Sequence, residues 1–250
     1  MKRSLPAIAL AGLALLLASA PAVTAAEVRL ICSNALHSVM TELGPQFEKA
    51  TGHKLFITYG STGPLKTEIE KGAAFDLAIL GPAAIDDLIK QGKLTAATRV
   101  DLARSGMGVA IRKGASKPDL GSTEAFKRTL LNAKSIAYSD AGLTGIYLKG
   151  LFQKLGIADD LKSKTRHGRG AEMVAKGEAE IGMTQISEIL PVAGVELAGP
   201  LPPEMQQYTV FPAAVAAASQ QAEAAKALLK FLASLEAVRV IRSQGLEPQG

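Results

Sequence analysis

The sequence predicts an α/β fold of two lobes, each with a mixed, mostly parallel sheet flanked by helices. Short apolar runs of strand length alternate with segments of helical periodicity along the chain. The composition is that of a globular protein, with 48% apolar and 20% charged residues. No linker rich in Pro, Gly or Ser divides the chain into consecutive domains. This favours two lobes that share the chain, with strands crossing from one to the other.

The first 26 residues have the three parts of a secretory signal peptide. Lys2 and Arg3 give a positive start, residues 5–20 are almost wholly apolar, and small residues lead to a cleavage site after Ala26. An uncleaved anchor is the alternative, although the apolar run is short for a membrane helix of about 20 residues. Cleavage would leave 224 of the 250 residues and lower the formal charge from +5 to +3, since Lys2 and Arg3 are lost. We therefore expect a periplasmic protein.

Strands and helices alternate regularly in the first half of the mature chain. We predict strands at 28–32, 54–59 and 76–80, and helices from 36 to the helix-ending Gly52, at 65–71 and at 83–91. Gly44-Pro45 should bend or break the first helix, because Pro lacks an N–H and clashes with the preceding turn. His37 is expected on the surface of this helix, and His53 as an exposed charge at its C-terminal end.

The second half continues the alternation. We predict strands at 106–112, 135–138, 180–184, 194–197 and 208–217, and helices at 122–132, 146–155, 170–176, 185–190, 222–232 and 237–242. Strands would cross between the lobes near 103–109 and 207–211. This predicts lobe 1 from residues 27–105 plus 208–250, and lobe 2 from residues 106–207.

The composition excludes several kinds of site. One Cys forms no internal disulfide and no Cys-rich metal site, and no His, Asp or Glu pair has metal-ligand spacing on one helix. Cys32 lies in a predicted strand, so we expect a buried apolar residue, with a reactive thiol as the alternative. The chain has no Lys/Arg run and no Trp for stacking bases. We expect no cofactor, no metal and no nucleic-acid partner.

Three loops that follow predicted strands carry the polar groups of a candidate site. They are Ser33-Asn34-Ala35, Gly60-Ser61-Thr62-Gly63 and the segment 139–145, and a helix start at Gly81-Pro82 accompanies them. Ligands of open α/β sheets bind beyond the carboxyl ends of the strands. Each loop offers backbone N–H groups at a helix start together with hydroxyl or amide side chains, which suits a small anion. Ordinary helix capping is the alternative for each loop taken alone.

Several segments resemble one known family over nearly the whole mature chain. They are "VRLICSNAL" from Val28, "FITYGSTGPLKTEIEKG" from Phe56, "FDLAIL" from Phe75, "TGIYLKGLFQKLGI" from Thr144, "GEAEIG" from Gly177, "YTVFPAAV" from Tyr208 and "GLEPQG" at the end. In their order and spacing they are similar to the periplasmic molybdate-type substrate-binding proteins of ABC importers. The resemblance implies a two-lobe fold with the ligand in the cleft between the lobes. It also implies hinge closure and delivery to an ABC permease in the inner membrane.

The resemblance also identifies ligand-reading positions at which this chain differs. Molybdate-specific members are expected to have Ser where this chain has Ala35, and Tyr where it has Gln185. A different oxyanion or a small organic acid is therefore an alternative ligand to molybdate. The predicted ligand-binding residues are Ser33, Asn34, Ala35, Ser61, Thr62, Gly63, Gly81, Leu143, Thr144 and Gln185.

Two arginines are further candidates for holding an anion. Arg166 and Arg169 precede the predicted helix at 170–176 and would pair a carboxylate or phosphonate if they faced the cleft. A solvated basic turn is the alternative.

An enzyme, such as a secreted hydrolase, is the main competing class. The chain has no Gly-x-Ser-x-Gly motif, so we expect a binding protein without catalytic residues. We also expect it to be a monomer. The sensing domain of a transcription regulator would lack the signal peptide. A binding protein that feeds a receptor or another carrier stays open.

Overall fold

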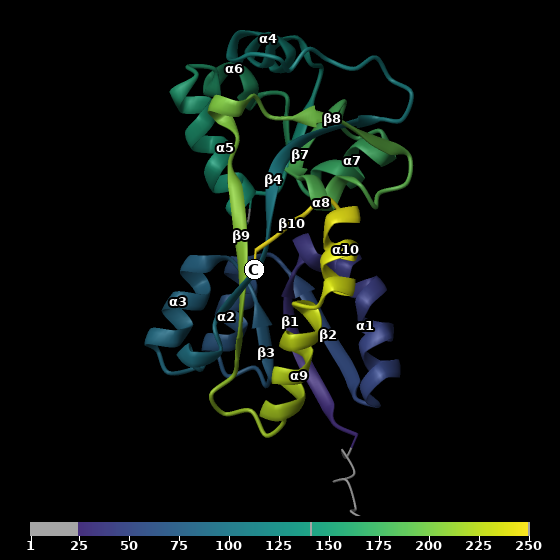
Figure 1. Cartoon of the computed structure of the whole chain (residues 1–250). Helices are drawn as coiled ribbons and strands as arrows, with labels where there is room; N and C mark the ends of the chain where they lie inside the picture. The colour runs from purple at the N-terminus through teal and green to yellow at the C-terminus, as the bar shows by residue number, and fades with distance from the viewer. Residues whose placement is uncertain (1–24, 141, 250) are drawn as a thin grey trace, which may run out of the picture.

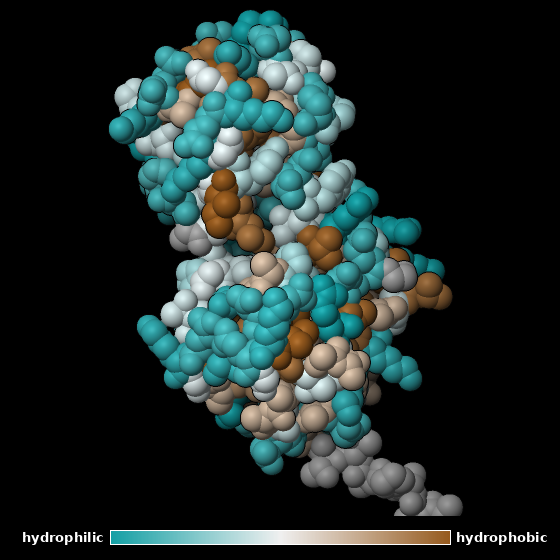
Figure 2. Space-filling view, turned by 90° about the vertical axis from the view of Figure 1, so that its left-hand side faces the viewer, coloured by the Kyte–Doolittle hydropathy of each residue, from teal (hydrophilic) through white to brown (hydrophobic). Residues whose placement is uncertain are grey.

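The computed structural model describes residues 25–140 and 142–249. The predicted signal peptide lies outside this part of the chain, except for Ala25 and Ala26. Figure 1 shows two lobes, with strands β4 (Val100–Arg112) and β9 (Tyr208–Val215) running between them. Figure 2, turned by 90°, shows a waist between the two lobes.

Lobe 1, the lower lobe of Figure 1, is a sheet covered by helices on both faces. Its strand β1 pairs in parallel with β2 and β3, and β3 pairs antiparallel with β9. Alternate residues of β1 face opposite sides. Leu30 packs toward α1, α9 and α10, whereas Ile31 packs toward α2 and α3. The elements are β1 (Glu27–Ser33), η1 (Asn34–Leu36), α1 (His37–Thr51), β2 (Lys54–Gly60), α2 (Thr62–Glu70), β3 (Leu77–Ile79), α3 (Pro82–Lys90), η2 (Ala96–Thr98), α9 (Ala222–Leu232), α10 (Leu235–Ser243) and β10 (Glu247–Pro248).

Lobe 2 is built in the same way around β5, which pairs in parallel with β6 and β7. One core lies between this sheet and α4, α5 and α6, with Phe126 and Phe152 in it, and a second lies under α7 and α8. The elements are α4 (Thr123–Asn132), β5 (Ile136–Tyr138), α5 (Leu143–Lys154), α6 (Ala158–Lys162), β6 (Thr165–His167), α7 (Gly170–Lys176), β7 (Ile181–Gln185), α8 (Ile186–Ile189), β8 (Val195–Pro200) and η3 (Pro203–Met205).

Strand β4 belongs to both lobes. It pairs with β9 as far as Gly106 opposite Tyr208, and with β7 from Met107 opposite Gln185. The side chain of Gln206 stabilises β4 where it crosses between the lobes. Its Oε1 accepts a hydrogen bond from the N–H of Met107 (2.8 Å), and its Nε2 donates to the carbonyl of Met107 (2.9 Å). The hydrogen-bonded strand order is therefore continuous through the molecule, β2-β1-β3-β9-β4-β7-β5-β6.

Helix α1 runs through Gly44-Pro45 without a break, which corrects that part of the expected bend or break. Pro45 is exposed, and so is Thr41, whose carbonyl loses its helical donor. The opposite face buries Met40 and Phe47 in the core of lobe 1. This packing outweighs the loss of one helical hydrogen bond.

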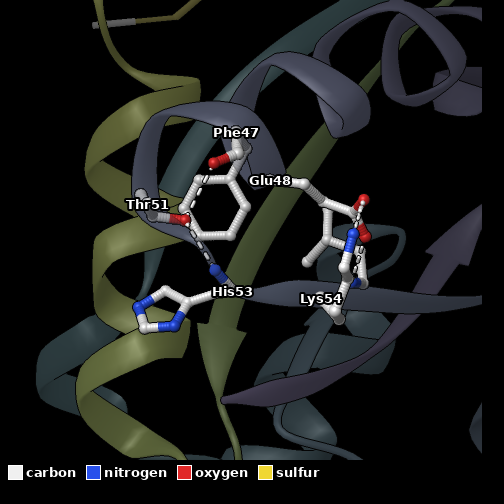
Figure 3. Close-up of polar contacts among 6 residues, drawn as sticks. Phe47, Glu48, Thr51, His53 and Lys54 are labelled. Atoms are coloured by element: carbon white, nitrogen blue, oxygen red, sulfur yellow. Dashed lines mark hydrogen bonds and ion pairs between the residues drawn. The ribbon is translucent and has the colours of Figure 1, made fainter. Parts of the chain in front are cut away.

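His53 corrects a second expectation, because it is 5% exposed rather than a surface charge. Its Nδ1 accepts a hydrogen bond from the N–H of Ala26 (3.1 Å), and its ring lies 5.9 Å from that of Phe47. Figure 3 shows the ring beneath the end of α1, where the N–H of His53 donates to the hydroxyl of Thr51. His53 thus joins the start of β1 to the turn before β2. His37 is exposed, as expected, and stacks against Tyr59.

Among the described residues, no helix combines the length and the apolar character that crossing a membrane requires.

Candidate ligand-binding site

The loops that follow β1, β2 and β5 meet the end of β7 at the waist of the molecule, where they line a cavity of about 50 Å³. These are the carboxyl ends of the parallel strands, where α/β sheets place ligands. The cavity is lined by Ser33, Asn34, Ala35, Gly60, Ser61, Thr62, Ser139, Gly142, Leu143, Thr144, Gln185, Glu188 and Phe211.

The first loop contributes Ser33, Asn34 and Ala35. The hydroxyl of Ser33 accepts a long hydrogen bond from the N–H of Ala35 (3.4 Å) and so caps the short helix η1. Ala35 is buried and presents only a methyl group, which adds no donor to the cavity.

The second loop contributes Ser61 and Thr62 at the start of α2. Ser61 occupies the capping position, but its side chain makes no capping bond. Thr62 Oγ1 accepts a hydrogen bond from the N–H of Gly81 (3.1 Å), so its own proton stays available to a ligand. Gly63 and Gly81 do not line the cavity. Gly81 instead supports Thr62 from behind.

The third loop, which follows β5 in lobe 2, contacts lobe 1. A Cβ placed on Gly142 would lie 3.6 Å from the side chain of Ser61, and one placed on Gly81 would lie 2.7 Å from Leu143 Cδ1. Gly145 packs closely too, since a Cβ there would lie 2.4 Å from the carbonyl oxygen of Ser139. The N-termini of α2 and α5, one from each lobe, therefore open at the same cavity.

Gln185 ends β7 and lies against both crossing strands. Its side-chain Nε2 donates to Thr209 Oγ1 on β9 (3.2 Å) and contacts the sulfur of Met107 on β4 (3.6 Å). The residue is 4% exposed, and within the described residues its Oε1 has no hydrogen-bond partner. A buried acceptor of this kind is costly unless a ligand donates to it.

A second cavity of about 40 Å³ adjoins the first. The two share Asn34, Ser61, Ser139 and Glu188, and the second, which we call the arginine cavity, adds Arg169, Gly170, Ala171, Glu172 and Thr184. Arg169 pairs with Glu172 (2.7 Å) and keeps 59% of its side chain exposed. Arg166 lines neither cavity and donates to the carbonyl oxygens of Ser163 and Thr165.

Glu188 and Phe211 line the cavity, although neither was predicted from the sequence. Glu188 lies on α8, one turn after Thr184, whose hydroxyl donates to its carboxylate. Burial raises the pKa of Glu188, and the Thr184 hydroxyl and the Arg169 charge oppose the rise. The four-residue spacing of Thr184 and Glu188 was the available signal. The site was predicted from a pattern of hydrogen-bond donors. A carboxylate repels an anion, so that pattern did not indicate Glu188.

A larger depression, of about 660 Å³, lies at the opposite edge of lobe 1, beside Arg29, Asp76 and Lys93. Its buried carboxylate, Asp76, is already bonded to the N–H of Arg29 (2.8 Å) and to the hydroxyl of Ser219 (2.6 Å). This carboxylate is thus satisfied within the protein, and the carboxyl ends of the parallel strands lie at the waist, so we place the site there.

Proteins of known structure share this architecture. The periplasmic molybdate-binding protein of Azotobacter vinelandii superposes with a TM-score of 0.74 at 20% identity, covering 89% of this chain and all of the other. The sulfate-binding protein SubI of Mycobacterium tuberculosis superposes with a TM-score of 0.72 at 16% identity, covering 89% and 87%. These likenesses confirm the predicted two-lobe α/β fold.

Sequence relatives extend over the same length. An aconitate isomerase from a Pseudomonas species is 37% identical over 257 aligned positions, covering 98% of this chain and 97% of the relative. The molybdate-binding protein ModA of Azotobacter vinelandii is 28% identical, covering 90% and 91%. Residues 28–247 match the profile described as bacterial extracellular solute-binding protein. The chain therefore belongs to the bacterial extracellular solute-binding protein family.

Proposed function

We propose that this chain binds a small organic acid with two or more carboxylates in the cleft between its lobes, and delivers it to the permease of an ABC importer. The observation that carries the proposal is the pair of adjoining cavities. One is lined by hydroxyls, an amide and helix N-termini, and the other contains Arg169. A polycarboxylate can place one anionic group in each, whereas a single tetrahedral oxyanion fills only one.

The acceptors in the cleft argue against molybdate. A fully ionised oxyanion offers only acceptors, so it needs donors on every side, and an unmatched buried acceptor costs about 1–3 kcal/mol. Here Gln185 Oε1 and the carboxylate of Glu188 are acceptors, and Ala35 supplies no side-chain donor. A partly protonated acid or one with a hydroxyl group can donate to them.

Export through a cleaved signal peptide and hinge closure complete this proposal. The predicted signal sequence supports a periplasmic location, and the crossing strands β4 and β9 supply the hinge. We propose that the protein acts as a monomer, without metal or cofactor.

Catalysis on the bound acid is a second candidate function, in place of the simple binding protein that the sequence suggests. Two observations favour it. The 37% identical relative is an aconitate isomerase, and Glu188 places a carboxyl with raised pKa beside both cavities. Aconitate is an unsaturated tricarboxylate, so two of its carboxylates can occupy the two cavities while its third carboxyl, when protonated, can donate to the acceptors there.

A thermal-shift screen of the mature protein tests the ligand class. The panel is molybdate, tungstate, sulfate, phosphate, succinate, citrate, cis-aconitate and trans-aconitate. A ligand at 100 times its Kd stabilises the folded state by about 2.7 kcal/mol. We expect shifts with di- or tricarboxylates and none with molybdate. A shift with molybdate alone would overturn the proposal.

Ser61→Ala tests the place of binding. The Ser61 hydroxyl lines both cavities and makes no capping bond, so its loss should weaken binding of the best carboxylate about tenfold or more, at about 1.5–3 kcal/mol for a hydrogen bond to a charged group. Ser116→Ala, on a separate surface of lobe 2, is the control and should leave affinity unchanged. Equal affinities by calorimetry would remove Ser61 from the site.

A further inference from the structure

We propose that Glu188 accepts and returns a proton during migration of a carbon–carbon double bond in an unsaturated polycarboxylate held across the two cavities. The proposal rests on the proposed binding of such an acid. It assigns to Glu188 a catalytic role, which the residues that merely bind the carboxylates do not have.

The position of Glu188 carries the argument. It is one of four residues that line both cavities, and the other three are Asn34, Ser61 and Ser139, which have no proton affinity in the useful range. An acid with an anionic group in each cavity has its middle carbons at the junction that these four residues form. The carboxyl of Glu188 at this junction therefore lies beside the middle carbon atoms of the ligand rather than beside the ligand's carboxylates.

Other charged groups near the cleft are already engaged. Arg169 pairs with Glu172 on α7, and Asp140, which lines neither cavity, pairs with Lys149. Glu188 accepts hydrogen bonds from the Thr184 hydroxyl and the backbone N–H of Gln185, faces the charges of Arg169 and Glu172, and has no ion-pair partner within the described residues. Burial also makes its carboxylate more basic than an exposed one, which improves a general base. Among the described residues, Glu188 is thus the carboxyl free to take a proton from a ligand at this junction.

The reaction balances without another reagent. The Glu188 carboxylate removes a proton from a saturated carbon next to the double bond, and the electron pair of the broken C–H bond spreads over the double bond and an adjoining carboxylate. The protonated Glu188 then returns the proton to the carbon at the far end of this three-carbon unit. The double bond has moved, and the carboxyl is ionised again. The donors at Ser61, Ser139 and the helix N-termini stabilise the extra charge on the substrate carboxylate.

Proton NMR in deuterium oxide tests the proposal with cis-aconitate as the probe. We expect the wild-type protein to exchange the methylene protons for deuterium and to form the trans isomer. Glu188→Gln should lower both rates at least 100-fold, because general acid–base catalysis contributes about 10²–10⁴-fold. Its Kd for trans-aconitate by calorimetry should stay within about threefold, which also shows that the variant is folded. Glu178→Gln, at an exposed position after α7, is the matched control and should keep wild-type rates.

The outcomes separate this inference from the proposed function. If Glu188→Gln exchanges protons at the wild-type rate, the assignment of Glu188 is wrong. If the wild-type protein binds aconitate but catalyses neither exchange nor formation of the trans isomer, the inference fails and the proposed binding function stands. If no carboxylate binds at all, the proposed function itself is overturned, and the inference with it.

Discussion

Glu188 is a carboxyl that lines both cavities, and its environment makes folding sensitive to pH. Because burial raises its pKa in the folded protein, the folded state holds the proton more tightly than the unfolded chain does. Its contribution to stability is therefore complete below the ordinary pKa of Glu, 4.5, and is lost as the pH rises through the higher folded value.

We predict that Glu188→Gln stabilises the protein relative to the wild type as the pH rises from 4 to 7. The difference in unfolding free energy should grow by up to about 1.4 kcal/mol per pH unit in the window between the two pKa values. Urea unfolding of both proteins at four pH values measures it. A difference that does not change with pH would show that the pKa of Glu188 is not raised by folding.

Single residues show where sequence patterns fail. His53 follows a helix-ending Gly, which is typical of an exposed cation, yet the N–H of Ala26 binds its ring from 27 positions earlier in the chain. Glu188 is similar, since it lines a cavity with Arg169 and Ser61, which only the fold brings near. Ser33, Ser61 and Thr144 were predictable because local loop chemistry and strand ends place them. Their binding of a ligand stays a prediction.

At the scale of elements, the long helices and buried strands were predictable from periodicity. Strand β4 was expected from residue 106 but begins at Val100, because its first part pairs with β9, more than 100 positions away. The lobe boundary that we predict after residue 105 lies one residue before the place where β4 changes partner, between Gly106 and Met107. The short elements α6 and β6 were not predicted, since five and three residues carry too little periodicity.

The starts of α3 and α5 meet across the cleft at Gly81 and Leu143, and this contact yields a prediction. Gly81→Val should weaken ligand binding about fivefold or more, because overpacking costs about 1–3 kcal/mol and opposes closure of the lobes. Val is needed rather than Ala, since the Leu143 side chain can turn aside for one methyl group.

Two further variants complete the comparison at this contact. Gly81→Val combined with Leu143→Ala should recover much of the affinity, measured by calorimetry. Gly150→Val, in α5 with open space around it, serves as the control. An unchanged affinity in Gly81→Val would mean that the two helix starts do not approach each other in the bound form.

At the scale of the whole molecule, we expect the rate of chemical labelling of Cys32 to measure global unfolding. It lies fully buried in β1 between β2 and β3, and burial raises the pKa of its thiol, so the reactive thiolate is scarce in the folded protein. We predict that iodoacetamide labels the protein only through unfolding. A bound ligand at 100 times its Kd should slow labelling about 100-fold, because it lowers the unfolded population by that factor.

Mass spectrometry of the labelled protein over time measures this rate, with protein in urea as the reference for full reactivity. Rapid labelling without denaturant would contradict the buried position of Cys32. A rate that is insensitive to a ligand of proven affinity would show local opening of β1 rather than global unfolding.

The place of β9 in lobe 1 also governs the order in which the nascent chain can fold. This strand pairs with both β3 and β4, so lobe 1 lacks the strand between them until the ribosome has passed Val215. The lobe 2 part of β4 begins at Met107 and the last strand of that lobe ends at Pro200, so lobe 2 can close before lobe 1 does. The lobe that contains the first residues of the mature chain is therefore the last to complete its sheet.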